Sequence, residues 1–173
     1  MLDLTLANYV TLSRIILIPL IITLLLLGLN GLAVIIFLAL SFSDAVDGYI
    51  ARRFNQVSDL GKFLDPLADK ILVMSVLIVL VGLGKASSIP VIILTARELV
   101  VQGLRISAAR YKNIIAASPV AKWKTATQIV AVALLILKLP YAGWILWLSV
   151  VLSLLSGGAY LWQSQILKQL RSS

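Results

Sequence analysis

Cysteine and histidine are both absent from this sequence of 173 residues. Without cysteine the chain can form no disulfide, no thiolate nucleophile and no cysteine-based zinc site. Without histidine it has no imidazole base and lacks the side chain that most often binds transition metals. Any chemistry that the chain performs must therefore use carboxylates, hydroxyl groups, lysine and arginine.

Charged residues are scarce as well, at 13% of the chain, whereas 61% of the residues are apolar. A soluble domain is typically about a quarter charged and about half apolar. The mean hydropathy of +1.05 therefore reflects more apolar surface than one globular core can bury. The sequence predicts that lipid surrounds much of the chain, and its length favours a single domain over residues 1–173.

Long apolar runs, in contrast, are abundant. A membrane-spanning helix needs about 20 mostly apolar residues. Six segments qualify: residues 12–29, 32–52, 60–83, 89–111, 119–139 and 141–163. Residues 1–11 combine apolar and polar side chains in a pattern that fits a short helix at the membrane interface. The sequence thus predicts an all-α membrane protein with six transmembrane helices and a short N-terminal interfacial helix.

The net charge of +8 comes from fifteen basic and seven acidic residues. In a soluble protein this excess would suggest nucleic acid, but in so apolar a chain membrane orientation and anionic lipid explain it better, with no nucleic-acid partner. The connectors after the first, third and fifth segments contain only Lys85 and Lys138, and all other basic residues lie at or nearer the opposite ends. The positive-inside rule therefore predicts that both termini and the connectors 53–59 and 112–118 are cytoplasmic.

Most of the acidic residues are concentrated in one stretch. Five of the seven fall between positions 44 and 69, and four of those lie inside predicted membrane segments: Asp44, Asp47, Asp65 and Asp69. An ionised carboxylate in a membrane costs about 2.5–3.5 kcal/mol, so these residues need a function. Helical periodicity places each pair on one face of its own helix. The four carboxylates can then converge near the cytoplasmic ends of two antiparallel helices and bind a pair of divalent cations, Mg²⁺ or Mn²⁺.

Small residues accompany these carboxylates. Gly48, Ala51 and Gly61 keep the same helix faces free of side chains, and Arg52 supplies a cation suited to phosphate. Two other interpretations remain open: the carboxylates are buried polar residues that satisfy one another, or they line the path of a divalent-cation channel or transporter. A cation path has no use for an arginine beside its carboxylates, so the pattern favours a diphosphate site.

Eight positions within 26 residues make up this pattern: Asp44, Asp47, Gly48, Ala51, Arg52, Gly61, Asp65 and Asp69. Their spacing resembles, without departure, the signature of the CDP-alcohol phosphatidyltransferases. Residues 52–56, 63–70, 96–99 and 122–125 are in addition similar to stretches of the bacterial phosphatidylglycerophosphate synthases within that family.

The resemblance implies transfer of the phosphatidyl group from CDP-diacylglycerol to sn-glycerol 3-phosphate, giving phosphatidylglycerophosphate and CMP. Asp44, Asp47 and Asp65 would hold two metal ions, and Asp69, also at the metal site, would take the proton from the acceptor hydroxyl. The resemblance also assigns contacts with CDP-diacylglycerol to Asn8, Thr11, Gly48, Ala51, Arg52, Ser58 and Gly61. The main alternative is the same chemistry with another acceptor, such as inositol phosphate, serine or phosphatidylglycerol.

A phosphate-bearing acceptor needs fixed cations in a membrane site, and Arg105 and Lys122 are the candidates near the cytoplasmic side. Lys124 lies on the opposite side of its helix from Lys122, and we interpret it as extending to lipid headgroups. Glu98 is expected to pair with Arg97 or Arg105.

The sixth segment carries a stripe of small and polar residues: Ser149, Ser153, Ser156, Gly157 and Tyr160. We interpret it as a helix-packing seam, which can include a homodimer contact, and a substrate contact is the alternative. The protein is expected to be a homodimer in the inner membrane of a bacterium, with its active site on the cytoplasmic side.

Overall fold

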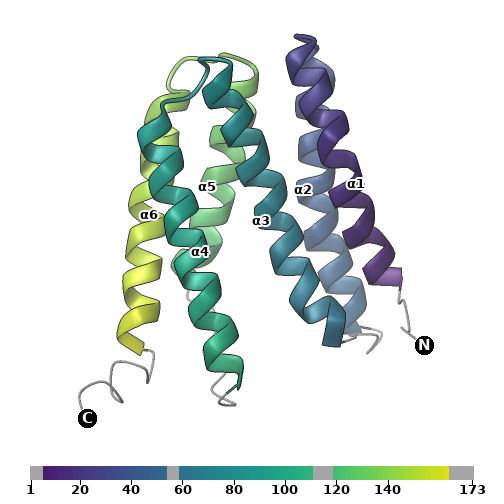
Figure 1. Ribbon diagram of the computed structural model, residues 1–173, viewed down its shortest axis with the longest axis vertical. Coiled ribbons are helices and arrows are strands. Elements are labelled where there is room, and N and C mark those ends of the chain that lie inside the picture. The colour runs from purple at the N-terminus through teal and green to yellow at the C-terminus, as the bar shows by residue number, and fades with distance from the viewer. Residues whose placement is uncertain (1–5, 54–58, 111–118, 164–173) are drawn as a thin grey trace.

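The computed structural model describes residues 6–53, 59–110 and 119–163, and these form six helices and no strand. The helices are α1 (Leu6–Leu26), α2 (Asn30–Arg53), α3 (Asp59–Gly82), α4 (Ser88–Arg110), α5 (Pro119–Ile136) and α6 (Ala142–Gln163). They run up and down in one bundle (Figure 1). We call the end that holds the α1–α2, α3–α4 and α5–α6 connections the hairpin end, and the end where α1 begins and α6 finishes the terminal end.

Packing joins the helices through a continuous apolar core. α1 lies against α2 and α3, α6 lies against α5 and α4, and α5 also contacts α2 and α3. Every helix contributes buried side chains to this core, among them Ile21, Phe37, Leu77, Leu94, Val132 and Leu146. The all-α prediction is confirmed for the described residues, and the predicted segments match the helices to within a few residues except at the N-terminus.

The separate N-terminal interfacial helix is wrong for the residues that the structure describes. α1 begins at Leu6 and continues without a break to Leu26, so residues 6–11 form its first turns. No glycine or proline separates these residues from the apolar segment that follows, and nothing local therefore ends a helix between them. Residues 1–5 lie outside the described part of the chain.

Three helices finish at the hairpin end with the same backbone turn. α1, α3 and α5 are each followed by a residue with a left-handed backbone: Gly28 (φ 74°), Gly84 (φ 66°) and Lys138 (φ 56°). In each turn the next amide donates to the carbonyl five residues earlier, over 2.8–3.0 Å, which is the Schellman arrangement. Glycine adopts this conformation freely, whereas a residue with a Cβ is disfavoured there by roughly 1–2 kcal/mol. The left-handed backbone at Lys138 is therefore conformationally unfavourable for lysine.

The bundle exposes more large apolar side chains than a soluble protein does, and it also buries several charged ones. Large apolar side chains are exposed on all six helices, for example Ile16, Ile35, Ile78, Leu99, Val130 and Leu155. The interior holds buried polar and charged side chains, including Arg14, Glu98, Lys124 and Gln128. Within the described residues, the helix Ala142–Trp162 alone has the length and composition to cross a membrane, and α1, α2 and α3 contain shorter apolar stretches. The prediction of six spans stays a prediction.

Candidate active site

The four signature carboxylates lie on the helices that the sequence predicts. Asp44 and Asp47 are in the last turns of α2, and Asp65 and Asp69 are in the first half of α3. α2 finishes and α3 begins at the terminal end of the bundle (Figure 1). Because both stretches are helical, the spacings of three and four residues place each pair on one face. The backbone thus agrees with a shared site, whereas the side chains of these aspartates lie outside what the structure describes.

The other predicted site residues are placed in the same way. Asn8 and Thr11 lie in α1, three more residues lie in α2 (Gly48, Ala51 and Arg52), Gly61 lies in α3 and Arg105 lies in α4. The structure describes the helical backbone at these positions but not the side chains. Ser58 lies outside the described residues altogether. The assignment of these residues to CDP-diacylglycerol or to the acceptor stays a prediction.

Arg14 is a charged residue beside this region that the sequence reasoning missed. It lies in α1, is only 2% exposed, and donates from Nε and Nη2 to Ser43 Oγ at 3.3 and 3.2 Å. Ser43 immediately precedes Asp44, so a buried guanidinium lies against the α2 segment that carries the signature. The sequence could have indicated this residue, because Arg14 lies within the apolar segment 12–29 and an ionisable residue inside a membrane segment usually has a function.

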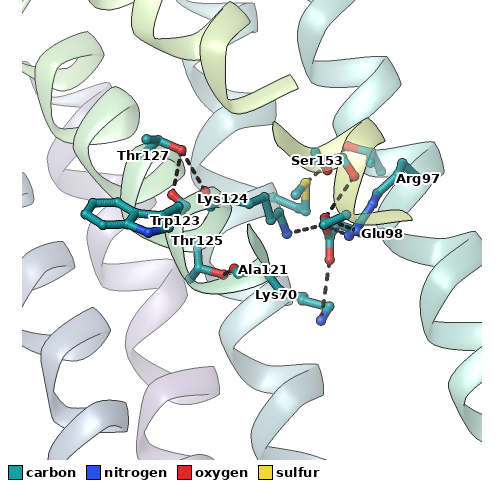
Figure 2. A network of polar contacts seen from close by, with 12 residues as sticks. Lys70, Arg97, Glu98, Ala121, Trp123, Lys124, Thr125, Thr127 and Ser153 are labelled. Carbon is teal, nitrogen blue, oxygen red and sulfur yellow. Dashed lines mark hydrogen bonds and ion pairs between the residues drawn. The ribbon is translucent and has the colours of Figure 1, made fainter. Parts of the chain in front are cut away.

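A second buried charge cluster joins four helices around Glu98, as Figure 2 shows. Glu98 Oε1 accepts hydrogen bonds from Arg97 Nη1 at 2.8 Å and from Lys124 Nζ, and Glu98 Oε2 lies 3.4 Å from Lys70 Nζ. Arg97 Nη2 also donates to Ser156 Oγ at 2.6 Å. We call Lys70, Arg97, Glu98 and Lys124 the Glu98 cluster. Through it α3, α4, α5 and α6 are held together.

The Glu98 cluster is rich in positive charge. Among the side chains that the structure describes, three cations surround one carboxylate, and the Glu98 side chain is only 4% exposed. Such an arrangement depends on the carboxylate, because without it one buried and two partly buried cations would lie close together with no anion between them. Lys70 directly follows Asp69 in the chain. The cluster therefore fixes the position of α3 one residue from a signature carboxylate.

Two expectations about this region are decided by the structure. The pairing of Glu98 with Arg97 is confirmed. The interpretation of Lys124 as a residue that extends to lipid headgroups is wrong, because its side chain is buried and binds Glu98. Lys122, on the other side of α5, is exposed. Helix α5 is rotated so that the Lys124 side faces α4, which the sequence of α5 alone does not specify.

The stripe on α6 is a packing seam within one chain. Ser149, Ser153 and Ser156 are buried. A Cβ atom added at Gly157 would lie 2.9 Å from Arg97 Nε, so glycine leaves space for the arginine. These residues are covered by helices of the same chain, which agrees with the packing seam, whereas a homodimer stays a prediction.

The donor chemistry of the signature fits a hard divalent cation. Carboxylate oxygens are the ligands that Mg²⁺ and Mn²⁺ prefer, and aspartates of adjacent helices at one end of the bundle can supply them. Among the described side chains, no group of three or more aspartates, glutamates, cysteines or histidines occurs.

Comparison with known proteins agrees with the signature. Residues 4–155 match the sequence profile of the CDP-alcohol phosphatidyltransferases. The chain is 39% identical over 178 residues to a protein of Bacillus subtilis (strain 168) named CDP-diacylglycerol–glycerol-3-phosphate 3-phosphatidyltransferase, covering 90% of this chain and 92% of the relative. A protein of the same name from Rickettsia prowazekii (strain Madrid E) is 39% identical over 171 residues, covering 91% and 94%. The signature, its position on α2 and α3, and these matches lead to one conclusion: the chain belongs to the CDP-alcohol phosphatidyltransferase family.

Proposed function

We propose that this chain transfers the phosphatidyl group of CDP-diacylglycerol to sn-glycerol 3-phosphate, giving phosphatidylglycerophosphate and CMP. The observation that carries this proposal is the similarity, over nine-tenths of the chain, to relatives named for that reaction. The complete signature on α2 and α3 supports it, since the aspartates, small residues and arginine are all present.

The proposed setting is a bilayer crossed by all six helices, as an integral protein of the inner membrane of a bacterium. The exposed apolar side chains on every helix and the charged side chains inside the bundle support this, because lipid contacts the outside while polar groups satisfy one another within. The distribution of basic residues supports a cytoplasmic terminal end, with Lys85 and Lys138 at the hairpin end.

We propose that Asp44, Asp47, Asp65 and Asp69 hold two Mg²⁺ or Mn²⁺ ions. Bound there, the metals would neutralise the diphosphate of CDP-diacylglycerol and stabilise the charge that develops on the departing CMP. Arg52 adds a fixed positive charge for the same diphosphate, and the small residues of the signature leave space for it. Ser58, Asn8 and Thr11 are proposed to contact the nucleotide.

The proposed reaction is a displacement at phosphorus. Asp69 accepts the proton of the acceptor hydroxyl, whose oxygen bonds to the phosphorus of the phosphatidyl group as the bond from that phosphorus to the CMP oxygen breaks. A carboxylate serves as the base because the chain has no histidine. Its neighbour Lys70 is held by Glu98 at 3.4 Å, which supports a fixed position for this part of α3.

Arg105 and Lys122 are the proposed contacts for the acceptor's phosphate. Arg105 lies in α4 two helical turns beyond Glu98, and Lys122 lies in the first turns of α5, so both are near the terminal end. We also propose a homodimer. Its interface would use surfaces other than the α6 seam, because that seam is covered within the chain.

The test is CMP release from CDP-diacylglycerol by the purified protein with a panel of acceptors. We expect release with sn-glycerol 3-phosphate that requires Mg²⁺ or Mn²⁺ and stops when the metal is chelated. Release with inositol phosphate, serine or phosphatidylglycerol, but not with glycerol 3-phosphate, would reassign the acceptor. No release with any acceptor would contradict the proposed activity.

A further inference from the structure

A cavity lies at the hairpin end, at the opposite end of the bundle from the signature carboxylates. It has a volume of about 460 Å³ and is formed by the α3–α4 connection, the α5–α6 connection and the first turns of α6. That volume is within the usual range for small-molecule sites. Its lining includes Lys85 and Lys138 together with Tyr141 and Trp147, and none of its lining residues is acidic.

The two lysines give the cavity an uncompensated positive charge. Lys85 Nζ donates to the neutral oxygens of Asn30 Oδ1 at 2.6 Å and of the Ile136 carbonyl at 3.5 Å. Burial lowers the pKa of Lys85, and the neighbouring charge of Lys138 lowers it further. The second effect shows that the two ammonium groups are near enough to repel each other, and no acidic residue lines the cavity. An anion in the cavity would relieve this repulsion.

The backbone around the cavity provides an independent observation. Lys138 has a left-handed backbone at a position where the equivalent turns after α1 and α3 have glycine, and Tyr141 is also left-handed, with φ 66°. Two non-glycine residues adopt this unfavourable conformation, and both line the same cavity. Retention of their side chains despite the conformational cost indicates that these side chains have a function there. Because the turn fixes its backbone, Lys138 is positioned at the cavity rather than free on a flexible loop.

The remaining lining residues indicate what kind of anion fits. Trp147 and Tyr141 are exposed aromatic residues of the kind that occupies the level of lipid headgroups. Leu83 and Leu146 add apolar wall beside the charged groups. A cavity lined by two ammonium groups together with apolar and aromatic surface suits a ligand with a phosphate and attached acyl chains.

We propose that this cavity binds the phosphate of an anionic phospholipid in the leaflet opposite the active site, with Lys85 and Lys138 as its charged contacts. The proposal rests on the membrane setting proposed above but not on the identity of the acceptor. Phosphate could also come from free inorganic phosphate in solution, and the experiment separates the two sources.

The experiment uses the full chain in phosphatidylcholine-containing micelles, to which short-chain phosphatidylglycerol, more phosphatidylcholine or sodium phosphate is added. Binding is followed by native mass spectrometry and by the change in Tm. We expect selective binding of phosphatidylglycerol, weakened about tenfold or more in Lys85→Gln and in Lys138→Gly. Lys168→Gln, which removes a lysine beyond the end of α6, is the matched control and should bind as the unaltered chain does.

Lys138→Gly keeps the test meaningful even though lysine variants can perturb folding. Glycine suits the left-handed position, so without added lipid this variant should have a Tm about 2–8 °C higher than the unaltered chain while losing the response to phosphatidylglycerol. Equal binding of the two lipids, equal binding of sodium phosphate, or unchanged affinity in both variants would overturn the proposal. CMP release is measured on the same samples: its absence from the unaltered chain, with lipid binding intact, would count against the proposed function alone.

Discussion

Glu98→Gln should be among the most destabilising substitutions of this chain. The change keeps the shape of the side chain but removes its charge, so Lys70, Arg97 and Lys124 would be left around a neutral amide. Glu98 Oε1 would lose charge-assisted hydrogen bonds from Arg97 and Lys124, and the amide would add N–H donors that face other donors.

The magnitude follows from burial. Breaking a buried ion pair by removing one partner typically costs about 3–5 kcal/mol, and water screens this cluster little because the Glu98 side chain is only 4% exposed. For a chain of this size about 1 kcal/mol corresponds to roughly 2–4 °C in Tm. We therefore expect Tm to fall by roughly 6–20 °C, measured by thermal unfolding of the purified protein in detergent.

Companion variants make the reasoning specific. Lys124→Met should destabilise the protein less than Glu98→Gln does, since Glu98 keeps Arg97 and Lys70. The loss of unfolding free energy in the double variant Glu98→Gln/Lys124→Met should be smaller than the sum of the two single losses by at least about 1 kcal/mol. Lys122→Gln, at an exposed position of the same helix, is the control and should change stability by no more than about 0.5 kcal/mol. The account of the cluster would be refuted by a Glu98→Gln effect as small as that of the control, or by additive effects in the double variant.

Three further predictions concern the proposed activity and orientation. Asp44→Asn should abolish CMP release while the protein still inserts, because removing an intramembrane charge lowers the cost of insertion. Asp69→Asn should also lose turnover but retain measurable CDP-diacylglycerol binding, and near-normal turnover in this variant would reject Asp69 as the base. Arg105→Ala and Lys122→Ala should each raise KM for glycerol 3-phosphate about tenfold or more and change KM for CDP-diacylglycerol little, whereas the reverse pattern would misplace the acceptor pocket. A cysteine at Gln56 should react with impermeant thiol reagents only from the cytoplasmic side, and labelling of intact cells would reverse the proposed orientation.

Local patterns in the sequence were enough to predict the helices. Apolar runs of about 20 residues, separated by short connectors with glycine or polar residues, mark where a helix can form and where it ends. The signature residues were also identifiable, since Asp44 and Asp47, like Asp65 and Asp69, are related by helical spacing within one segment. One local inference was wrong: residues 6–11 continue α1 instead of forming a helix of their own.

The sequence by itself determined the helix positions, the signature on α2 and α3, and an apolar exterior, because each depends on residues close together in the chain. The tertiary structure decided which faces meet. Lys124 of α5 binds Glu98 of α4, and Arg14 of α1 donates to Ser43 of α2. The α6 stripe is covered by helices of its own chain. It also placed Lys138 in a left-handed turn beside Lys85, with no glycine to signal it. The rotation of a helix about its axis is set by the packing of all its neighbours together, and the periodicity of a single segment does not specify it.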